Sequence, residues 1–223
     1  MVDLDLIGEP FEERATQALS SHRTAMHLLD LREGIEMIPE GEAGDAHHCH
    51  NGNCLDPHIW LSPRRVQQQA KAIAQTLIEL YPENKEFYEK NLETTLKKLD
   101  TLDLDLQKTL APLRGKKILV SHPAFGYLAA DYGFTQIPFE QEGKDPTPQR
   151  LTQLLKTAKS SGARTIFVQA QHTAGKGINL IANELGMQVE ELDPLAENYF
   201  KNMRTMAERL ATQSQKQTRS STQ

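Results

Sequence analysis

The sequence has little of what marks a membrane-spanning, disulfide-linked or nucleic-acid-binding protein. It contains no apolar run of about 18 residues, the length that crosses a bilayer. Two cysteines are too few for a disulfide framework, and a net charge of −5 argues against nucleic-acid binding. The first residues also lack the basic and apolar regions of a signal peptide. These absences leave a water-soluble, mildly acidic protein as the expected class.

Recognisable catalytic motifs are also missing. The glycine-rich stretch at Ala174 to Gly177 does not have the spacing of a phosphate-binding loop. There is no G-x-S-x-G sequence, which would indicate a hydrolase nucleophile, and no HExxH-like pair for a zinc hydrolase. We therefore do not expect an enzyme.

From Gly115 onward, the sequence alternates between strand and helix patterns. Such alternation is typical of an α/β fold in which helices cover both faces of a parallel sheet. The expected strands are 116–121, 134–140, 164–169 and 187–193, and the expected helices are 124–133, 148–162, 177–186 and 197–211.

The first half indicates a second, incomplete lobe of the same type. A strand pattern at Val2 to Gly8 precedes a helix pattern, and residues 35–53 have the composition of a surface loop. A helix is expected from Pro63, with Ser62 as its N-cap. It is followed by a long helix at 84–114 with a leucine stripe. That stripe suits a helix lying across a core, and a coiled-coil dimer is the alternative.

These patterns predict two parallel-sheet lobes joined by a long linking helix. The predicted divisions are a partial N-terminal lobe at 1–83 with a His-rich loop at 41–54, the linking helix at 84–114, a C-terminal lobe at 115–210, and a disordered tail at 211–223.

Three residues are candidates for a metal site. His122 and Asp193 each follow an expected strand, and the carboxyl ends of parallel strands line the ligand crevice of an α/β sheet. His58 lies just before the helix that starts at Pro63 and could reach the same crevice. Two imidazoles and a carboxylate suit zinc. Each residue alone is more often a cap, a turn or a packed side chain than a metal ligand.

A separate cluster lies in the loop before His58. Imidazole-rich flexible segments bind zinc or nickel loosely, because the chain must become ordered on binding. The two cysteines could contribute as thiolates or form a small disulfide loop, and a solvated loop without a specific role is the alternative. The residues are His47, His48, Cys49, His50 and Cys54.

Four stretches resemble the metal-binding solute-binding proteins of ABC transporters, in particular the zinc-specific, ZnuA-like branch. DPHIWLSP (56–63) and SHPAFGYLAADYGF (121–134) resemble the most specific motifs of the family. The block at 146–169 and LDPLAENYF (192–200) resemble two later segments. The His-rich insertion before residue 56 is itself typical of the zinc branch.

The resemblance implies a role for each candidate ligand. His58 and His122 would hold the metal, and Asp193 matches an aspartate that binds metal in some members. The manganese branch usually has Glu where this chain has His122, so zinc is favoured. Cys49 and Cys54 match no ligand of the family. The start of the chain resembles the third strand-and-helix unit of the first lobe, so a further His ligand and the signal peptide are expected upstream of it.

The expected function is therefore zinc capture in the periplasm or at the cell surface, with delivery to an ABC permease. No transmembrane segment and no nucleic-acid partner are expected. Manganese or iron uptake by the same fold is the first alternative. A cytosolic metal-buffering or interaction protein is an alternative of another class.

Deleting residues 45–53 tests the expected role of the His-rich loop. We expect fewer weakly bound zinc ions per chain and one retained tight site, because the loop donors are separate from His58 and His122. Zinc titration of the metal-stripped protein by calorimetry measures both. Loss of the tight site on deletion would contradict this division of roles.

Overall fold

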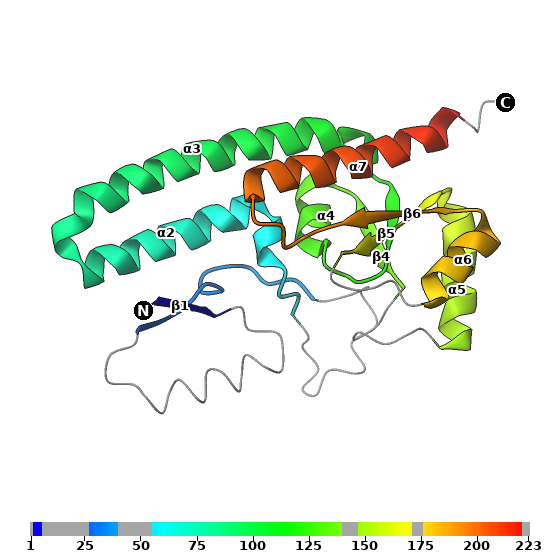
Figure 1. The fold of residues 1–223 in the computed structure, drawn as a ribbon, viewed down its shortest axis with the longest axis horizontal. Coiled ribbons are helices and arrows are strands. Elements are labelled where there is room, and N and C mark those ends of the chain that lie inside the picture. Colours follow the sequence, from blue (N-terminus) through cyan, green and yellow to red (C-terminus); the bar gives the residue numbers. More distant parts are fainter. Residues whose placement is uncertain (1, 6–26, 40–54, 140–146, 171–175, 220–223) are drawn as a thin grey trace.

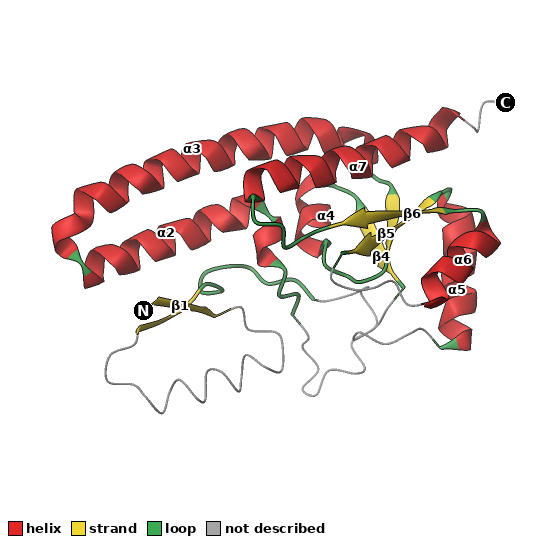
Figure 2. Ribbon diagram, viewed as in Figure 1, coloured by secondary structure: helices red, strands yellow, loops and turns green. Residues whose placement is uncertain are grey.

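The structure is a computed structural model of a chain with two separate parallel sheets and several long helices (Figures 1 and 2). Within the part of the chain that it describes, no helix combines the length and apolar character needed to cross a membrane. The described residues are 2–5, 27–39, 55–139, 147–170 and 176–219.

The larger sheet has four parallel strands in the order β4-β3-β5-β6. They are β3 (Lys117–Val120), β4 (Thr135–Pro138), β5 (Thr165–Gln169) and β6 (Gln188–Leu192). The helices between and after them are α4 (Gly126–Tyr132), α5 (Pro148–Ser161), α6 (Lys176–Leu185) and α7 (Tyr199–Arg219). The predicted α/β alternation is confirmed, because each strand lies within a segment that the sequence pattern assigned to a strand.

Helices cover both faces of this sheet, as the buried clusters indicate. On one face, Leu119 and Ile166 pack with residues of α5 and α6. On the other face, Val120 and Phe167 pack with residues of α3, α4 and α7. Adjacent strand residues thus point to opposite faces, which is the period that a strand imposes. All five residues of β5 are buried, as expected for a central strand covered on both sides.

Two helices form an antiparallel hairpin (Figure 1). These are α2 (Pro63–Leu80) and α3 (Lys85–Leu110), joined through a 3₁₀ turn at Pro82–Asn84. The predicted cap is present, because the Ser62 hydroxyl accepts a hydrogen bond from the backbone N–H of Arg65 at 3.2 Å. A second 3₁₀ turn (Ala111–Leu113) follows α3.

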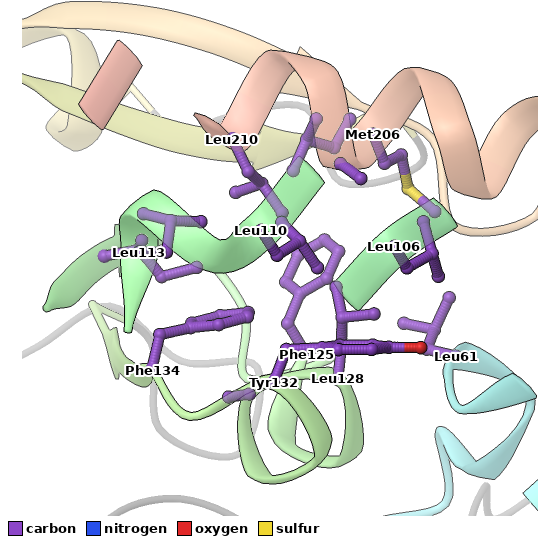
Figure 3. Packing of buried hydrophobic residues seen from close by; sticks show 14 of the residues in the cluster. Leu61, Leu106, Leu110, Leu113, Phe125, Leu128, Tyr132, Phe134, Met206 and Leu210 are labelled. Atoms are coloured by element: carbon purple, nitrogen blue, oxygen red, sulfur yellow. The ribbon is translucent and has the colours of Figure 1, made fainter. Parts of the chain in front are cut away.

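The leucine stripe of α3 lies on a core of the chain itself, as predicted. Four of its leucines are fully buried. All but Leu99 pack in one cluster with α7 and the sheet, and Figure 3 shows Leu106 and Leu110 close to Met206 and Leu210. The coiled-coil alternative is not needed to explain this stripe. The four leucines are Leu99, Leu102, Leu106 and Leu110.

The smaller sheet contains a strand that the sequence analysis missed. Strand β1 (Val2–Asp5) pairs in parallel with β2 (His27–Asp30). The four-residue β2 is too short to display a period, and no turn residue precedes it. The Arg32 guanidinium donates to the Asp30 carboxylate at 2.6 Å and holds the pKa of that carboxyl below its usual value.

The expectation of a surface loop from residue 35 is wrong for its first part. Ile35 is buried with Ile59 and Tyr127, because it provides apolar surface that covers this aromatic ring. Pro39 forms an antiparallel bridge with Leu55, which closes the loop between them. Residues 40–54, which include the whole of the predicted His-rich loop at 41–54, lie outside the described residues.

The prediction of a disordered tail from residue 211 is also wrong as far as Arg219. Helix α7 continues to that residue, and Ala211 is buried in its core-facing side. A helix already docked by its first turns adds further residues without a new nucleation step. The tail is rich in Gln, Lys and Arg, which are good helix formers.

Two leucines of α3 provide a matched test of this core. Leu106 is fully buried and Leu104 is 54% exposed on the same helix. We expect Leu106→Ala to lower the free energy of unfolding by about 2–5 kcal/mol, because it leaves a cavity. Leu104→Ala should change it by less than about 0.5 kcal/mol. Urea denaturation of both variants measures the difference, and similar effects would contradict the packing.

Candidate metal-binding site

His58 lies on a short segment that packs tightly against the rest of the chain. A 3₁₀ turn (Ile59–Leu61) follows it, and both Ile59 and Leu61 are buried. Leu61 belongs to the same core as α3, α4 and α7 (Figure 3). His58 itself is only 9% exposed. The position of its imidazole is therefore set by apolar packing on the residues that follow it.

The buried carboxylate of Asp56 orients the His58 ring. Its Oδ1 accepts a hydrogen bond from the His58 backbone N–H at 2.8 Å and lies 2.7 Å from the His58 Nδ1. The Asp56 carbonyl accepts from the Tyr127 hydroxyl at 2.8 Å. Burial raises the pKa of Tyr127, so this hydroxyl stays protonated and remains a donor at neutral pH.

His122 follows β3 at the carboxyl end of the larger sheet. The Ser121 N–H extends the pairing by donating to the Phe167 carbonyl at 2.8 Å. A tight turn comes next, in which the Ala124 N–H donates to the His122 carbonyl at 2.9 Å. The half-buried imidazole of His122 lies 5.2 Å from that of His58, measured between ring centroids. The two rings are inclined at 73°. The structure thus brings together the two predicted histidines.

Asp193 follows β6 at the same edge of the sheet, as the topology predicted. Its Oδ1 accepts a hydrogen bond from the Leu195 N–H at 3.0 Å, and its carbonyl accepts from Asn202 at 2.6 Å. A side chain that caps its own turn in this way is common chemistry for Asp before Pro. Among the described residues there is no group of three or more His, Cys, Asp or Glu that could hold a metal, so Asp193 does not join the two imidazoles in this arrangement.

Two hydrogen bonds connect the His58 segment to the loop after β6. The Trp60 indole N–H donates to the Pro194 carbonyl at 3.1 Å, and the Tyr199 hydroxyl donates to the Trp60 carbonyl at 2.9 Å. Burial, aided by the negative charge of Asp131, raises the pKa of Tyr199. The hydroxyl therefore stays a donor at neutral pH, and the loop that carries Asp193 is held beside His58.

Sequence reasoning found the two imidazoles but gave no role to Asp56, Trp60 or Tyr199. Asp56 and Trp60 lie within the DPHIWLSP stretch, and an acidic residue two positions before a candidate ligand was the available signal for Asp56. Nothing local signals the link to Pro194 or Tyr199. The loop candidates lie outside the described residues: His47, His48, Cys49, His50 and Cys54.

Known proteins similar to this chain include a zinc-uptake protein and a zinc-binding protein. The chain is 34% identical over 169 residues to the high-affinity zinc uptake system protein ZnuA of Bacillus subtilis. The aligned region covers 75% of this chain and 52% of that protein. It is 32% identical over 199 residues to the zinc-binding protein AdcA of Streptococcus pyogenes, covering 81% and 38%. The chain thus spans about half the length of the Bacillus protein.

Solved structures give the same result for the fold. A crystal structure of ZnuA superposes with a TM-score of 0.81 at 37% identity, covering 92% of this chain and 76% of that one. A zinc-bound deletion mutant of ZnuA superposes with a TM-score of 0.80 at 38% identity, covering 92% and 75%. The α/β fold predicted from the sequence is confirmed by this agreement.

A protein-family model provides the assignment. The model described as "Zinc-uptake complex component A periplasmic" matches residues 6–213, which is most of the chain. This family is one of zinc-uptake components and not of enzymes, so the prediction of a non-enzymatic protein is confirmed. With its DPHIWLSP segment, its paired imidazoles and its parallel sheet, the chain belongs to the ZnuA family of zinc-uptake proteins.

Proposed function

We propose that this chain captures zinc in the periplasm and delivers it to an ABC permease. The observation that carries the proposal is the pairing of His58 and His122, which are far apart in the sequence and whose ring centroids lie 5.2 Å apart. Neutral imidazoles are good donors for zinc, and no catalytic step is required. Family membership supports both the metal and the route.

The spacing of the two rings suits a shared zinc ion. With Zn–N bonds of about 2.1 Å, each ring centroid would lie roughly 3.2 Å from the metal, and a tetrahedral angle would separate the centroids by about 5 Å. The observed separation of 5.2 Å agrees with this value. Two histidines supply only part of a tetrahedral shell, and Asp193 or water would complete it.

The helices provide the frame for capture. In our proposal, the linking segment at 84–114, which contains α3, joins the two lobes. It keeps their relative movement small, because the leucine stripe of α3 is anchored in the core beside α7. The loop donors His47, His48, His50, Cys49 and Cys54 would gather zinc outside the tight site. Delivery to the permease would follow release from the pair formed by His58 and His122.

Removal of either imidazole tests this proposal. We expect the metal-stripped chain to show one tight zinc site by calorimetry, and His58→Ala or His122→Ala to weaken it by more than about 100-fold, the upper range for loss of a group that only supports a ligand. His27 is exposed on β2 and provides the matched control. His27→Ala should leave the tight site unchanged. Equal zinc binding by all four proteins would refute the assignment of the site.

The identity of residue 122 bears on manganese or iron as the alternative cargo. An imidazole favours zinc, whereas a carboxylate oxygen suits manganese. We expect His122→Glu to lower the ratio of zinc affinity to manganese affinity by at least about tenfold, measured by competition between the two ions. An unchanged ratio would show that residue 122 does not select the metal. Tighter manganese than zinc binding by the unaltered chain would instead favour manganese as the cargo.

A further inference from the structure

The Asp56 carboxylate occupies a position that is unusual for an acidic side chain. Asp56 is only 1% exposed. Acidic residues are rarely buried to this degree in proteins unless they are paired. Its Oδ1 contacts two nitrogen atoms of the same residue, His58. Its Oδ2 is buried and has no hydrogen-bond partner among the described residues. A buried polar atom without a partner lowers stability, so this residue calls for an explanation other than folding.

The chemistry of the contact selects one form of the imidazole. A carboxylate only accepts hydrogen bonds, so the ring nitrogen 2.7 Å from Oδ1 must be the one that carries the proton. In a neutral imidazole, the other nitrogen then has the free lone pair. For His58, the proton is therefore on Nδ1, and Nε2 is the atom able to bind a metal ion.

The surroundings hold the carboxylate in place. The Asp56 N–H donates to the Ile38 carbonyl at 2.9 Å, and its own carbonyl accepts from Tyr127. Gly126, in the first turn of α4, faces the other side of the carboxylate. A Cβ atom at this position would overlap Asp56 Oδ2 and approach Ile38 within 3.0 Å. The absence of a side chain at residue 126 thus makes room for the carboxylate.

We propose that Asp56 is a positioning residue that fixes the tautomer and the orientation of His58 for zinc binding, and that Gly126 is required for it to do so. This inference rests on the proposed function, because it assigns a partner to one of the proposed ligands. A carboxylate behind a metal-binding histidine holds the ring and makes it a better donor. The cost of this role is one buried oxygen atom of Asp56 that has no hydrogen-bond partner within the part of the chain that the structure describes.

The test combines an NMR measurement on the metal-free protein with zinc titration. Long-range ¹H–¹⁵N correlation spectra, recorded well above the usual imidazole pKa, report which ring nitrogen carries the proton. In the unaltered chain we expect His58 to be protonated at Nδ1. Asp56→Ala removes the acceptor beside Nδ1, so this preference should be lost and zinc affinity should fall by about 10- to 100-fold.

A second variant disturbs the carboxylate without replacing it. Gly126→Ala should displace Asp56 and produce the same two changes, and it keeps the test valid if Asp56→Ala does not fold. Asp131→Ala is the matched control, because the Asp131 side chain is only 8% exposed but binds Ser62 and Arg65 instead of a proposed ligand. It should lower stability and leave the His58 tautomer unchanged.

The two measurements separate this inference from the proposed function. Protonation of His58 at Nε2 in the unaltered chain would overturn the inference, as would Asp56→Ala with an unchanged tautomer. A zinc loss in Asp56→Ala without a tautomer change would also overturn it, since Asp56 would then act through the fold. If the unaltered chain binds no zinc tightly but shows the expected tautomer, which is lost in Asp56→Ala, the positioning role is supported and the proposed function fails.

Discussion

The burial of Leu61 in the core under α3, α4 and α7 is the contact on which the arrangement of the site depends. It anchors the segment that carries His58 to the larger sheet, which carries His122. Trp60 and Tyr199 add directed hydrogen bonds to this apolar contact. The residue after Leu61 is Ser62, whose hydroxyl donates a hydrogen bond to the Asp131 carboxylate at 2.5 Å. A five-residue segment is thereby held at several points, so the spacing between the two imidazoles is a property of the packed core.

Much of the fold could be predicted because its signals are local. The strand β5 is a short apolar run, and the helix α2 begins with a Ser-Pro cap that the structure reproduces. Strand β2 could not be predicted, since four residues carry no readable period and its partner β1 lies at the other end of a long connection. The length of α7 was underestimated because composition suggested a solvated tail, whereas a docked helix extends readily.

The site shows the same division between local and distant signals. His58 and His122 could be identified from their motifs and from their places beside a helix start and a strand end. The contacts of Trp60 could not, because its partners Pro194 and Tyr199 are 134 and 139 residues away in the sequence. Asp56 is close in sequence to His58, but the role proposed for it depends on its burial and its two contacts with that residue, which the sequence does not show.

The fixed spacing of His58 and His122 has a consequence for the entropy of binding. Both imidazoles are attached to packed segments, so little chain or side-chain freedom would be lost if an ion bridged them as proposed. An ion bound to one ring would encounter the second at a high effective concentration, as in a chelate. Donors on a loose segment would instead lose their freedom on binding. In the proposed scheme, a difference in affinity between a tight and a weak site would therefore follow from preorganisation as much as from the identity of the donor atoms.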